Sequence, residues 1–297
     1  MLLPGPVGIW TSALDALEVS AARDQVAELD AQGWDALWFG EAYGREAFTA
    51  AALYLSASQR MAVATGIASI YGRDATAANA AGRLLEAMHP GRFVLGLGVS
   101  HAPLVERVRG HDYGKPLTAM REYLHALDKA TYLAAGGAVP PPRVLAALGP
   151  KMLELARDRA HGAHPYLVTP EHTAEARAVL GDGPLLAVEQ AVVLSDDPEV
   201  FRARAHWHLE IYTGLPNYRN NWFRSGFTED DAVRGGSDRL KAALVVGGDE
   251  QAVVDRVQAH LDAGADHVCL QVLGPDAFTA PRQEWARLAP AMASLRS

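Results

Sequence analysis

The sequence predicts a (β/α)8 barrel, an α/β fold in which each parallel strand is followed by a helix. Eight short apolar segments alternate with helix-like segments along the chain. The 297 residues suit one such barrel and contain no low-complexity linker, so residues 1–297 are expected to form a single domain. A doubly wound sheet is the structural alternative, but its usual Gly-x-Gly-x-x-Gly turn after the first strand is missing from residues 8–12.

The predicted strands are short apolar runs, as expected where both faces of a parallel sheet are covered. They span residues 7–10, 36–39, 61–70, 93–98, 144–148, 166–168, 185–194 and 267–273. The prolines at 140–142 mark a turn just before the fifth of these strands.

The predicted helices show an apolar stripe beside a charged face or start at a capping residue. They span residues 17–32, 47–58, 75–88, 117–133, 150–159, a segment from 170, a segment from 198, 251–263 and 281–295. Three of them start after residues that can cap a helix, namely Asp74, Thr169 and Asp197. Residues 215–237 lack a clear period, which predicts an inserted loop region before the eighth strand.

Charge and composition exclude several classes of protein. The net charge of −8 comes from scattered Asp and Glu without a basic stripe, so nucleic acid is not an expected partner. No apolar stretch approaches the roughly 20 residues that cross a membrane. The first residues do not resemble a signal peptide, so a cytoplasmic location without a membrane partner is expected. The single Cys269 excludes an intrachain disulfide, and the histidine spacings give no reason to expect a metal.

The fourth predicted strand loses its side chains at Gly96 and Gly98 and leads into the polar residues Ser100 and His101. Glycine near the end of a strand indicates that a ligand or another backbone approaches closely. In a barrel, active groups lie at the C-terminal ends of the strands. The stretch therefore predicts either a ligand site or a tight barrel corner with a solvated loop.

Other predicted strands also end in polar residues, which would share the same barrel mouth. Glu41 follows the second strand, where it is either a general acid or base with a raised pKa or the cap of a neighbouring turn. Further candidates at the strand ends are Tyr43, Ser69, Met152, Glu189, Gln190 and Gln271.

The run from Leu148 through Gly149 to Lys151 places a glycine turn at a helix start, with a cation beside it. Free backbone N–H groups and the helix dipole favour a phosphate at such a position. The alternative is an ordinary capped helix with a solvated lysine. Beside a glycine-ended strand in a barrel mouth, the phosphate interpretation is favoured.

Aromatic residues gather around the inserted region. They form either a lid over an apolar substrate or an oligomer contact. These residues are Trp207, Tyr212, Tyr218, Trp222 and Phe223.

Two long runs carry a family resemblance, MAVATGIASIYGR at 61–73 and LEAMHPGRFVLGLGVSH at 85–101. They resemble the luciferase-like monooxygenase superfamily, and in detail its actinobacterial branch that uses the deazaflavin coenzyme F420. The runs ALGPKM at 147–152, YLVTPEHT at 166–173 and GADHV at 264–268 are similar to it as well. These segments follow one another in the family's order over almost the whole chain.

The resemblance implies a homodimeric barrel with F420, or alternatively FMN, in its mouth. It implies a bulge in the third strand with a cis peptide bond between Gly66 and Ile67, behind the cofactor ring. Leu97, Gly98 and Ser100 would flank the cofactor chain. Its phosphate would bind at the start of the helix after the fifth strand, on Leu148, Gly149, Lys151 and Met152, near Thr169.

The sequence departs from related deazaflavin-dependent dehydrogenases at two positions. Those enzymes have a histidine after the acidic residue that follows strand two, and a glutamate after the glycines of strand four. Here Ala42 and Val99 occupy these positions. Oxidation of an alcohol needs a base, so the departure argues against that activity unless His101 is the substitute, with Glu41 as the second catalytic candidate. The alternative is reduction of an activated double bond or imine, with the hydride coming from the cofactor.

The expected function is hydride transfer between F420 or a flavin and a small organic substrate, with the cofactor supplying the hydride chemistry. An FMN-dependent two-component monooxygenase is the alternative within the enzymes. A non-catalytic flavin-binding barrel is the alternative outside them.

Overall fold

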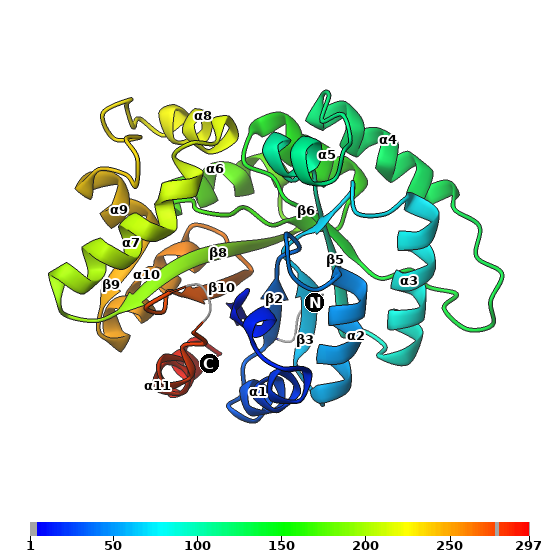
Figure 1. The fold of residues 1–297 in the computed structure, drawn as a ribbon, viewed down its shortest axis with the longest axis horizontal. Helices are drawn as coiled ribbons and strands as arrows, with labels where there is room; N and C mark the ends of the chain where they lie inside the picture. Colours follow the sequence, from blue (N-terminus) through cyan, green and yellow to red (C-terminus); the bar gives the residue numbers. More distant parts are fainter. Residues whose placement is uncertain (1–4, 277–278, 297) are drawn as a thin grey trace.

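The computed structural model describes residues 5–276 and 279–296 and shows a closed parallel barrel with helices around it (Figure 1). The strands pair in the order β1, β2, β3, β5, β6, β7, β8, β10, and β10 pairs again with β1. This closure confirms the (β/α)8 barrel. The strands are β1 (Val7–Trp10), β2 (Ala36–Phe39), β3 (Ala62–Thr65), β5 (Phe93–Gly98), β6 (Arg143–Leu145), β7 (Gly162–Ala163), β8 (Leu185–Leu194) and β10 (His267–Val272).

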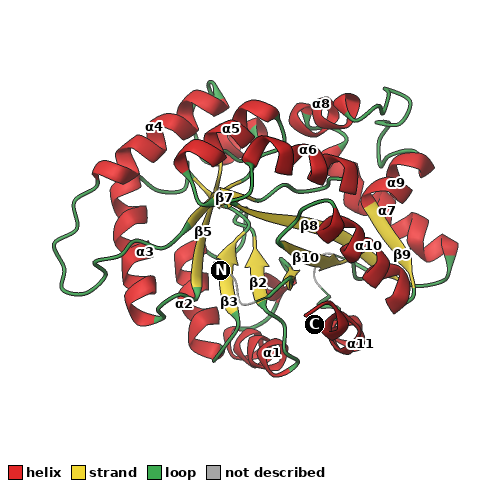
Figure 2. Cartoon of the chain, turned by 180° about the vertical axis from the view of Figure 1, so that it is seen from behind, coloured by secondary structure: helices red, strands yellow, loops and turns green. Residues whose placement is uncertain are grey.

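The helices pack outside the strands, as Figure 2 shows from behind. They are α1 (Val19–Ala31), α2 (Ala47–Ala57), α3 (Ala75–Met88), α4 (Pro116–Lys129), α5 (Pro150–Arg159), α6 (Pro170–Leu180), α7 (Pro198–Tyr212), α8 (Pro216–Arg224), α9 (Asp238–Leu244), α10 (Glu250–Asp262) and α11 (Arg282–Met292). The predicted caps are confirmed, because the side chains of Asp74, Thr169 and Asp197 each accept a hydrogen bond from a backbone N–H of the first turn. None of the helices in the described ranges combines the length and the apolar character that a bilayer crossing needs.

Trp38 fills the interior of the barrel. Its indole stacks on the His164 ring at 4.4 Å between centroids, and its Nε1 lies 3.2 Å from His267 Nε2. Small side chains on the facing strands, including Ala62 and Ala187, leave room for it. The interior is therefore a packed core, and a ligand has to bind at one end of the barrel.

The prediction of the sixth strand was wrong. The strand is β7 at Gly162–Ala163, several residues before the expected segment 166–168. Gly162 allows β8 to approach, since a Cβ there would lie 2.1 Å from the carbonyl oxygen of Leu185. Leu167 has a φ of 53°, which is incompatible with a strand, so the segment that follows β7 is a loop of the mouth.

The third predicted strand is divided in two. Its pairing stops at Thr65 and resumes in β4 (Ala68–Ser69), which pairs with the end of β5. The peptide bond between Gly66 and Ile67 is cis, as the family resemblance implies. The chain bulges at this point toward the barrel mouth.

The inserted region is more ordered than its sequence predicts. Helix α8 lies inside the expected loop 215–237, and α9 follows it. An additional strand, β9 (Val245–Gly248), pairs in parallel with residues 191–194 of β8, beyond the part of β8 that β7 covers. The long β8 thus carries both the barrel and the extension.

Candidate active site at the barrel mouth

The two glycines of β5 let the third strand and its bulge pack against β5. A Cβ on Gly96 would lie 1.8 Å from the carbonyl oxygen of Thr65, and a Cβ on Gly98 would lie 2.4 Å from two side-chain carbons of Ile67. The group that lies against Gly96 is therefore the backbone of β3 at Thr65. Ile67 thus packs on Gly98, and Leu97 pairs with Ala68, at the C-terminal end of β5. Ser100 follows two residues later with a φ of 56°.

Gly66 lies directly against two barrel side chains. The indole Nε1 of Trp10 donates a hydrogen bond of 2.9 Å to the Gly66 carbonyl oxygen. A Cβ on Gly66 would lie 2.9 Å from Nε2 of His164, an atom that is buried and has no hydrogen-bond partner in the described chain. Burial lowers the pKa of His164 to about 4, so its imidazole is neutral at pH 7.

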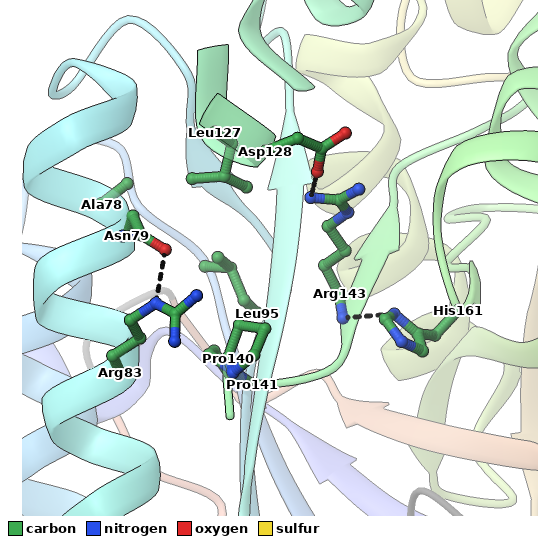
Figure 3. Close-up of a pocket in the computed structure, with 10 residues that line it drawn as sticks. All are labelled: Ala78, Asn79, Arg83, Leu95, Leu127, Asp128, Pro140, Pro141, Arg143 and His161. Carbon is green, nitrogen blue, oxygen red and sulfur yellow. Dashed lines mark hydrogen bonds and ion pairs between the residues drawn. The ribbon is translucent and has the colours of Figure 1, made fainter. Parts of the chain in front are cut away.

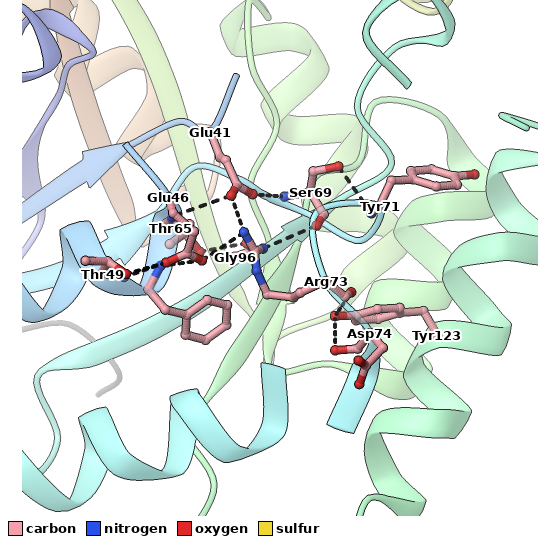
Figure 4. A network of polar contacts seen from close by, with 12 residues as sticks. Glu41, Glu46, Thr49, Thr65, Ser69, Tyr71, Arg73, Asp74, Gly96 and Tyr123 are labelled. Carbon is pink, nitrogen blue, oxygen red and sulfur yellow. Dashed lines mark hydrogen bonds and ion pairs between the residues drawn. The ribbon is translucent and has the colours of Figure 1, made fainter. Parts of the chain in front are cut away.

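Glu41 holds the loop that follows β4. Its Oε2 accepts a hydrogen bond of 2.9 Å from the backbone N–H of Ser69, and its Oε1 pairs with Arg73 and accepts from the N–H of Ala47. Arg73 also pairs with Glu46 at 2.9 Å (Figure 4). Only 5% of the Glu41 side chain is exposed. These contacts match the second interpretation of Glu41, the cap of a neighbouring turn.

His101 lies under the inserted region. Its ring is 5.8 Å from the ring of Tyr218 on α8, and its side chain forms a hydrogen bond with Asn217. Burial lowers the pKa of His101, and the Asn217 hydrogen bond opposes this shift. The imidazole is therefore mainly neutral at pH 7 and able to accept a proton.

The predicted phosphate loop leads into α5, and the space beside its Gly149 is largely unfilled by other atoms of the described chain. Gly149 is the N-cap residue of α5, and a Cβ there would have only the Arg224 guanidinium within 4 Å, at 3.5 Å. Lys151 is exposed and forms no ion pair with any described residue. His172 Nε2 donates a hydrogen bond of 2.9 Å to the Leu148 carbonyl oxygen and so joins the start of α5 to α6. Two cations thus flank the first turn, and one of them, Arg224, comes from the insert.

Thr169 and Met152 belong to the two helix starts that this hydrogen bond joins. The Thr169 hydroxyl caps α6 by accepting from the N–H of His172. Met152 is in the first turn of α5, half buried against the core. Lys151 and Met152 thus lie in the first turn of α5, and Thr169 lies at the N-terminus of α6.

Tyr212 of α7, Tyr218 of α8 and Tyr166 pack together and form an aromatic wall beside the insert. Tyr212 donates a hydrogen bond of 3.0 Å to the hydroxyl of Tyr166, which donates to Gln271 Oε1 at 2.5 Å. Tyr218 packs edge-on against the Tyr212 ring at 4.9 Å. Trp222 is also buried, whereas 44% of Trp207 is exposed.

Behind this wall lies Glu189, on the inward face of β8. Its Oε2 accepts a hydrogen bond of 2.9 Å from the backbone N–H of Leu167, whereas its Oε1 is buried without a partner in the described chain. Burial raises the pKa of Glu189 to about 8, so the carboxyl is largely protonated at pH 7. Its neighbour Gln190 points the other way, because successive side chains of a strand alternate, and hydrogen-bonds His260 of α10.

Two cavities differ in their position relative to this mouth. One, of about 220 Å³, lies between α3, α4 and the start of β6 (Figure 3). Its arginines are already paired, Arg143 with Asp128 and Arg83 with Asn79. The other, of about 470 Å³, is lined by Ala42 and by loops that follow β4 and β5. Only the second lies at the C-terminal ends of the strands, where barrel chemistry takes place.

Sequence reasoning did not identify Arg224 or Arg109 as site residues. Both are single arginines on segments without a motif, and they reach the mouth only through the packing of the insert and of the β5 loop. Tyr166 lies in the loop between β7 and α6, outside the strand that the sequence predicts for residues 166–168, whereas the predicted cap at Thr169 is correct.

A sequence model of the family described as luciferase-like monooxygenase matches residues 2–267. A Mycobacterium tuberculosis (strain ATCC 25618 / H37Rv) protein named as a coenzyme F420-dependent oxidoreductase is 36% identical over 99 residues, which are 33% of this chain and 28% of that protein. The matched segment is thus less than a third of the relative's length.

Solved structures are similar over nearly the full length. An F420-dependent secondary alcohol dehydrogenase, in complex with an F420-acetone adduct, gives a TM-score of 0.75 at 15% identity and covers 99% of both chains. The FMN-bound oxygenating constituent of 3,6-diketocamphane monooxygenase from Pseudomonas putida, a type II Baeyer-Villiger monooxygenase, gives a TM-score of 0.69 at 15% identity. It covers 98% of this chain and 97% of that one. At this level of identity the similarity concerns the fold.

Proposed function

The chain belongs to the luciferase-like monooxygenase family, and on that premise we propose that it is an oxidoreductase that transfers a hydride between coenzyme F420 and a small organic substrate. FMN, with a monooxygenase reaction, is the alternative cofactor. When bound, either group supplies the redox chemistry, and the protein binds and orients it. A deazaflavin has carbon in place of a flavin ring nitrogen, so it transfers hydride and reacts poorly with oxygen.

One observation supports this proposal beyond family membership. The space beside Gly149 is unfilled except for the Arg224 guanidinium, which lies next to it. The first turn of a helix has N–H groups without intrahelical partners, and its dipole favours an anion. Leu148, Gly149, Lys151, Met152 and Thr169 would hold the phosphate that both cofactors carry. The donor set thus fits the group that the family implies.

The ring end of the cofactor would lie over the bulge. Gly66 and Ile67 would support it from below, and Leu97, Gly98 and Ser100 would flank it. We propose His101 as the group that exchanges a proton with the substrate, because its neutral form is favoured and it lies beside the wall formed by Tyr218. Glu41 would position the loop after β4 rather than touch the substrate.

The test is a titration of the purified protein with oxidised F420 and with FMN, followed by fluorescence quenching. We expect micromolar binding of one of them, weakened at least tenfold by Gly149→Val, which fills the space beside this glycine, and severalfold by Lys151→Ala or Arg224→Gln. Arg234→Gln, an exposed change in the same insert, serves as the control. Micromolar binding of neither cofactor would overturn the proposal, and unchanged binding in the Gly149 and Lys151 variants would place the phosphate elsewhere.

We further propose that the protein is a cytoplasmic homodimer, as the resemblance implies. The apolar residues Trp207 and Ile211 of α7 support a contact between copies, since they lie one turn apart and are 44% and 71% exposed. Light scattering on the eluting protein gives the mass directly. Ile211→Glu should convert a dimer on this face into a monomer, whereas a monomeric parent protein would contradict the proposal.

A further inference from the structure

The larger cavity opens on the rim of the mouth, between three loops that follow barrel strands. Its volume is about 470 Å³. The residues that matter for its chemistry are Ala42 and Tyr43 after β2, Tyr71 and Gly72 after β4, and Arg109 and His111 after β5. The small residues Ala42 and Gly72 leave the space open.

Arg109 is the unusual member of this lining. Its Nε is buried and has no hydrogen-bond partner, and its guanidinium forms no ion pair with any residue that the structure describes. Arg109 as a whole is partly exposed, so its charge is not fully buried, but a buried N–H without an acceptor is costly. The guanidinium of Arg109 therefore has unused donors at the wall of an open cavity.

The neighbouring carboxylates of Glu41 and Asp112 form no ion pair with Arg109. A Cβ on Gly72 would lie 3.4 Å from a terminal nitrogen of Arg109 and 3.2 Å from Glu41 Oε2, so the two groups border the same glycine. Glu41, however, is already paired with Arg73. Asp112, in the same segment, accepts a hydrogen bond from the backbone N–H of Gly114. Neither carboxylate forms an ion pair with Arg109, and Glu41 is the one that pairs with another arginine.

We propose that this cavity binds an oxyanion of the substrate, a carboxylate or a phosphate, through the guanidinium of Arg109. The proposal rests on the proposed function, since the cavity adjoins the mouth in which the cofactor would bind. A planar guanidinium donates two parallel hydrogen bonds to either oxyanion, which gives it both charge and geometric complementarity. His111 offers a second nitrogen on the same wall. The substrate class is therefore an organic acid or a phosphate ester.

Inorganic phosphate and acetate are the probes that test this site without the cofactor or a known substrate. The thermal midpoint of the protein is measured against each anion, with sodium chloride at matched ionic strength as the reference. We expect at least one anion to give a saturable rise, and the stronger of the two separates phosphate esters from carboxylic acids. In Arg109→Gln the apparent affinity should fall at least tenfold.

Three further variants test whether the anion binds through the guanidinium of Arg109. Arg107→Gln removes the same charge from an exposed position two residues away, and Arg109→Lys keeps the charge without the planar fork. Lys151→Ala removes the cation at the start of α5, the other place where phosphate would bind. The rise should persist in Arg107→Gln and in Lys151→Ala and should weaken in Arg109→Lys.

The inference is overturned if neither anion exceeds the chloride reference, or if the rise survives unchanged in the double variant Arg109→Gln/Lys151→Ala, in which both candidate anion sites have lost a cation. Cofactor titration of the same Arg109→Gln protein separates this result from the proposed function. We expect F420 or FMN affinity to stay within about twofold of the parent protein. Loss of oxyanion binding with intact cofactor binding supports both proposals, whereas a protein that binds oxyanions through Arg109 but neither cofactor refutes only the proposed function.

Discussion

The carbonyl oxygen of Thr65 lies 1.8 Å from the point that a Cβ on Gly96 would occupy. The Thr65 hydroxyl also donates a hydrogen bond of 2.7 Å to the Gly96 carbonyl oxygen. Strands β3 and β5 therefore meet without a side chain between them. This contact sets the position of the bulge at Gly66 and Ile67, which forms the floor of the mouth.

Gly96→Ala should destabilise the protein strongly, because the methyl group meets backbone rather than a movable side chain. Overpacking of this kind costs about 1–3 kcal/mol or more. Urea unfolding measures the loss. Gly183→Ala is the matched control, since a Cβ there meets no atom within 4 Å, and equal effects in the two variants would contradict the argument.

Glu41 and Arg73 should behave as one structural unit. Glu41→Gln and Arg73→Gln each leave a nearly buried partner without its opposite charge, at a cost of about 2 kcal/mol. In a double-mutant cycle the two changes should be non-additive by about 1 kcal/mol or more. Additive losses, or a loss of turnover in Glu41→Gln with full stability, would instead favour Glu41 as an acid or base.

Glu189 should make the protein less stable as the pH rises. Burial raises the pKa of its carboxyl from 4.5 to about 8, so the folded state keeps a proton that the unfolded chain loses above pH 4.5. Stability is therefore lost from about pH 4.5 up to about pH 8, and each pKa unit corresponds to about 1.4 kcal/mol.

Glu189→Gln removes this titration. Relative to the parent protein, the variant should gain stability at pH 7.5 compared with pH 4. Unfolding midpoints at both values measure the difference, and Glu175→Gln, an exposed change on α6, should follow the parent protein. A parent-like pH dependence in Glu189→Gln would show that the carboxyl is ionised or solvated in the folded state.

Buried histidines should make the protein less stable at low pH as well. Burial lowers the pKa of His208 to about 4, and its Nε2 has no partner in the described chain. The unfolded chain takes up a proton below about pH 6.5, which the folded state resists, so stability is lost between pH 6.5 and 4. His164 and His267, with pKa values also lowered to about 4, add to the same loss.

His208→Phe should remove one part of that acid sensitivity, because an aromatic ring of similar shape fills the site without titrating. Chemical unfolding at pH 7 and pH 4.5 measures how much the free energy of unfolding falls between the two pH values. His125→Gln on the exposed face of α4 is the control. If His208→Phe loses as much stability between these pH values as the parent protein, His208 is protonated in the folded protein.

The sequence by itself determined the barrel and much of its mouth. The alternation of short apolar runs with amphipathic segments is a local consequence of burying strands behind helices, so it is visible without the structure. The same holds for the caps at Asp74, Thr169 and Asp197, and for the glycine turn at Gly149, because each depends only on neighbouring backbone.

Only the tertiary structure decided which distant groups meet there. The sixth strand is a two-residue element whose pairing depends on Gly162 lying against Leu185, and a pattern that short carries no period. Arg224 reaches Gly149 across 75 positions of sequence, and Arg109 reaches Gly72 from another loop. The pKa values of Glu189 and His208 follow from burial, which is a property of the packed interior. Local periodicity reports which face a segment buries, whereas contacts, burial and charge pairing are fixed only when the segments pack together.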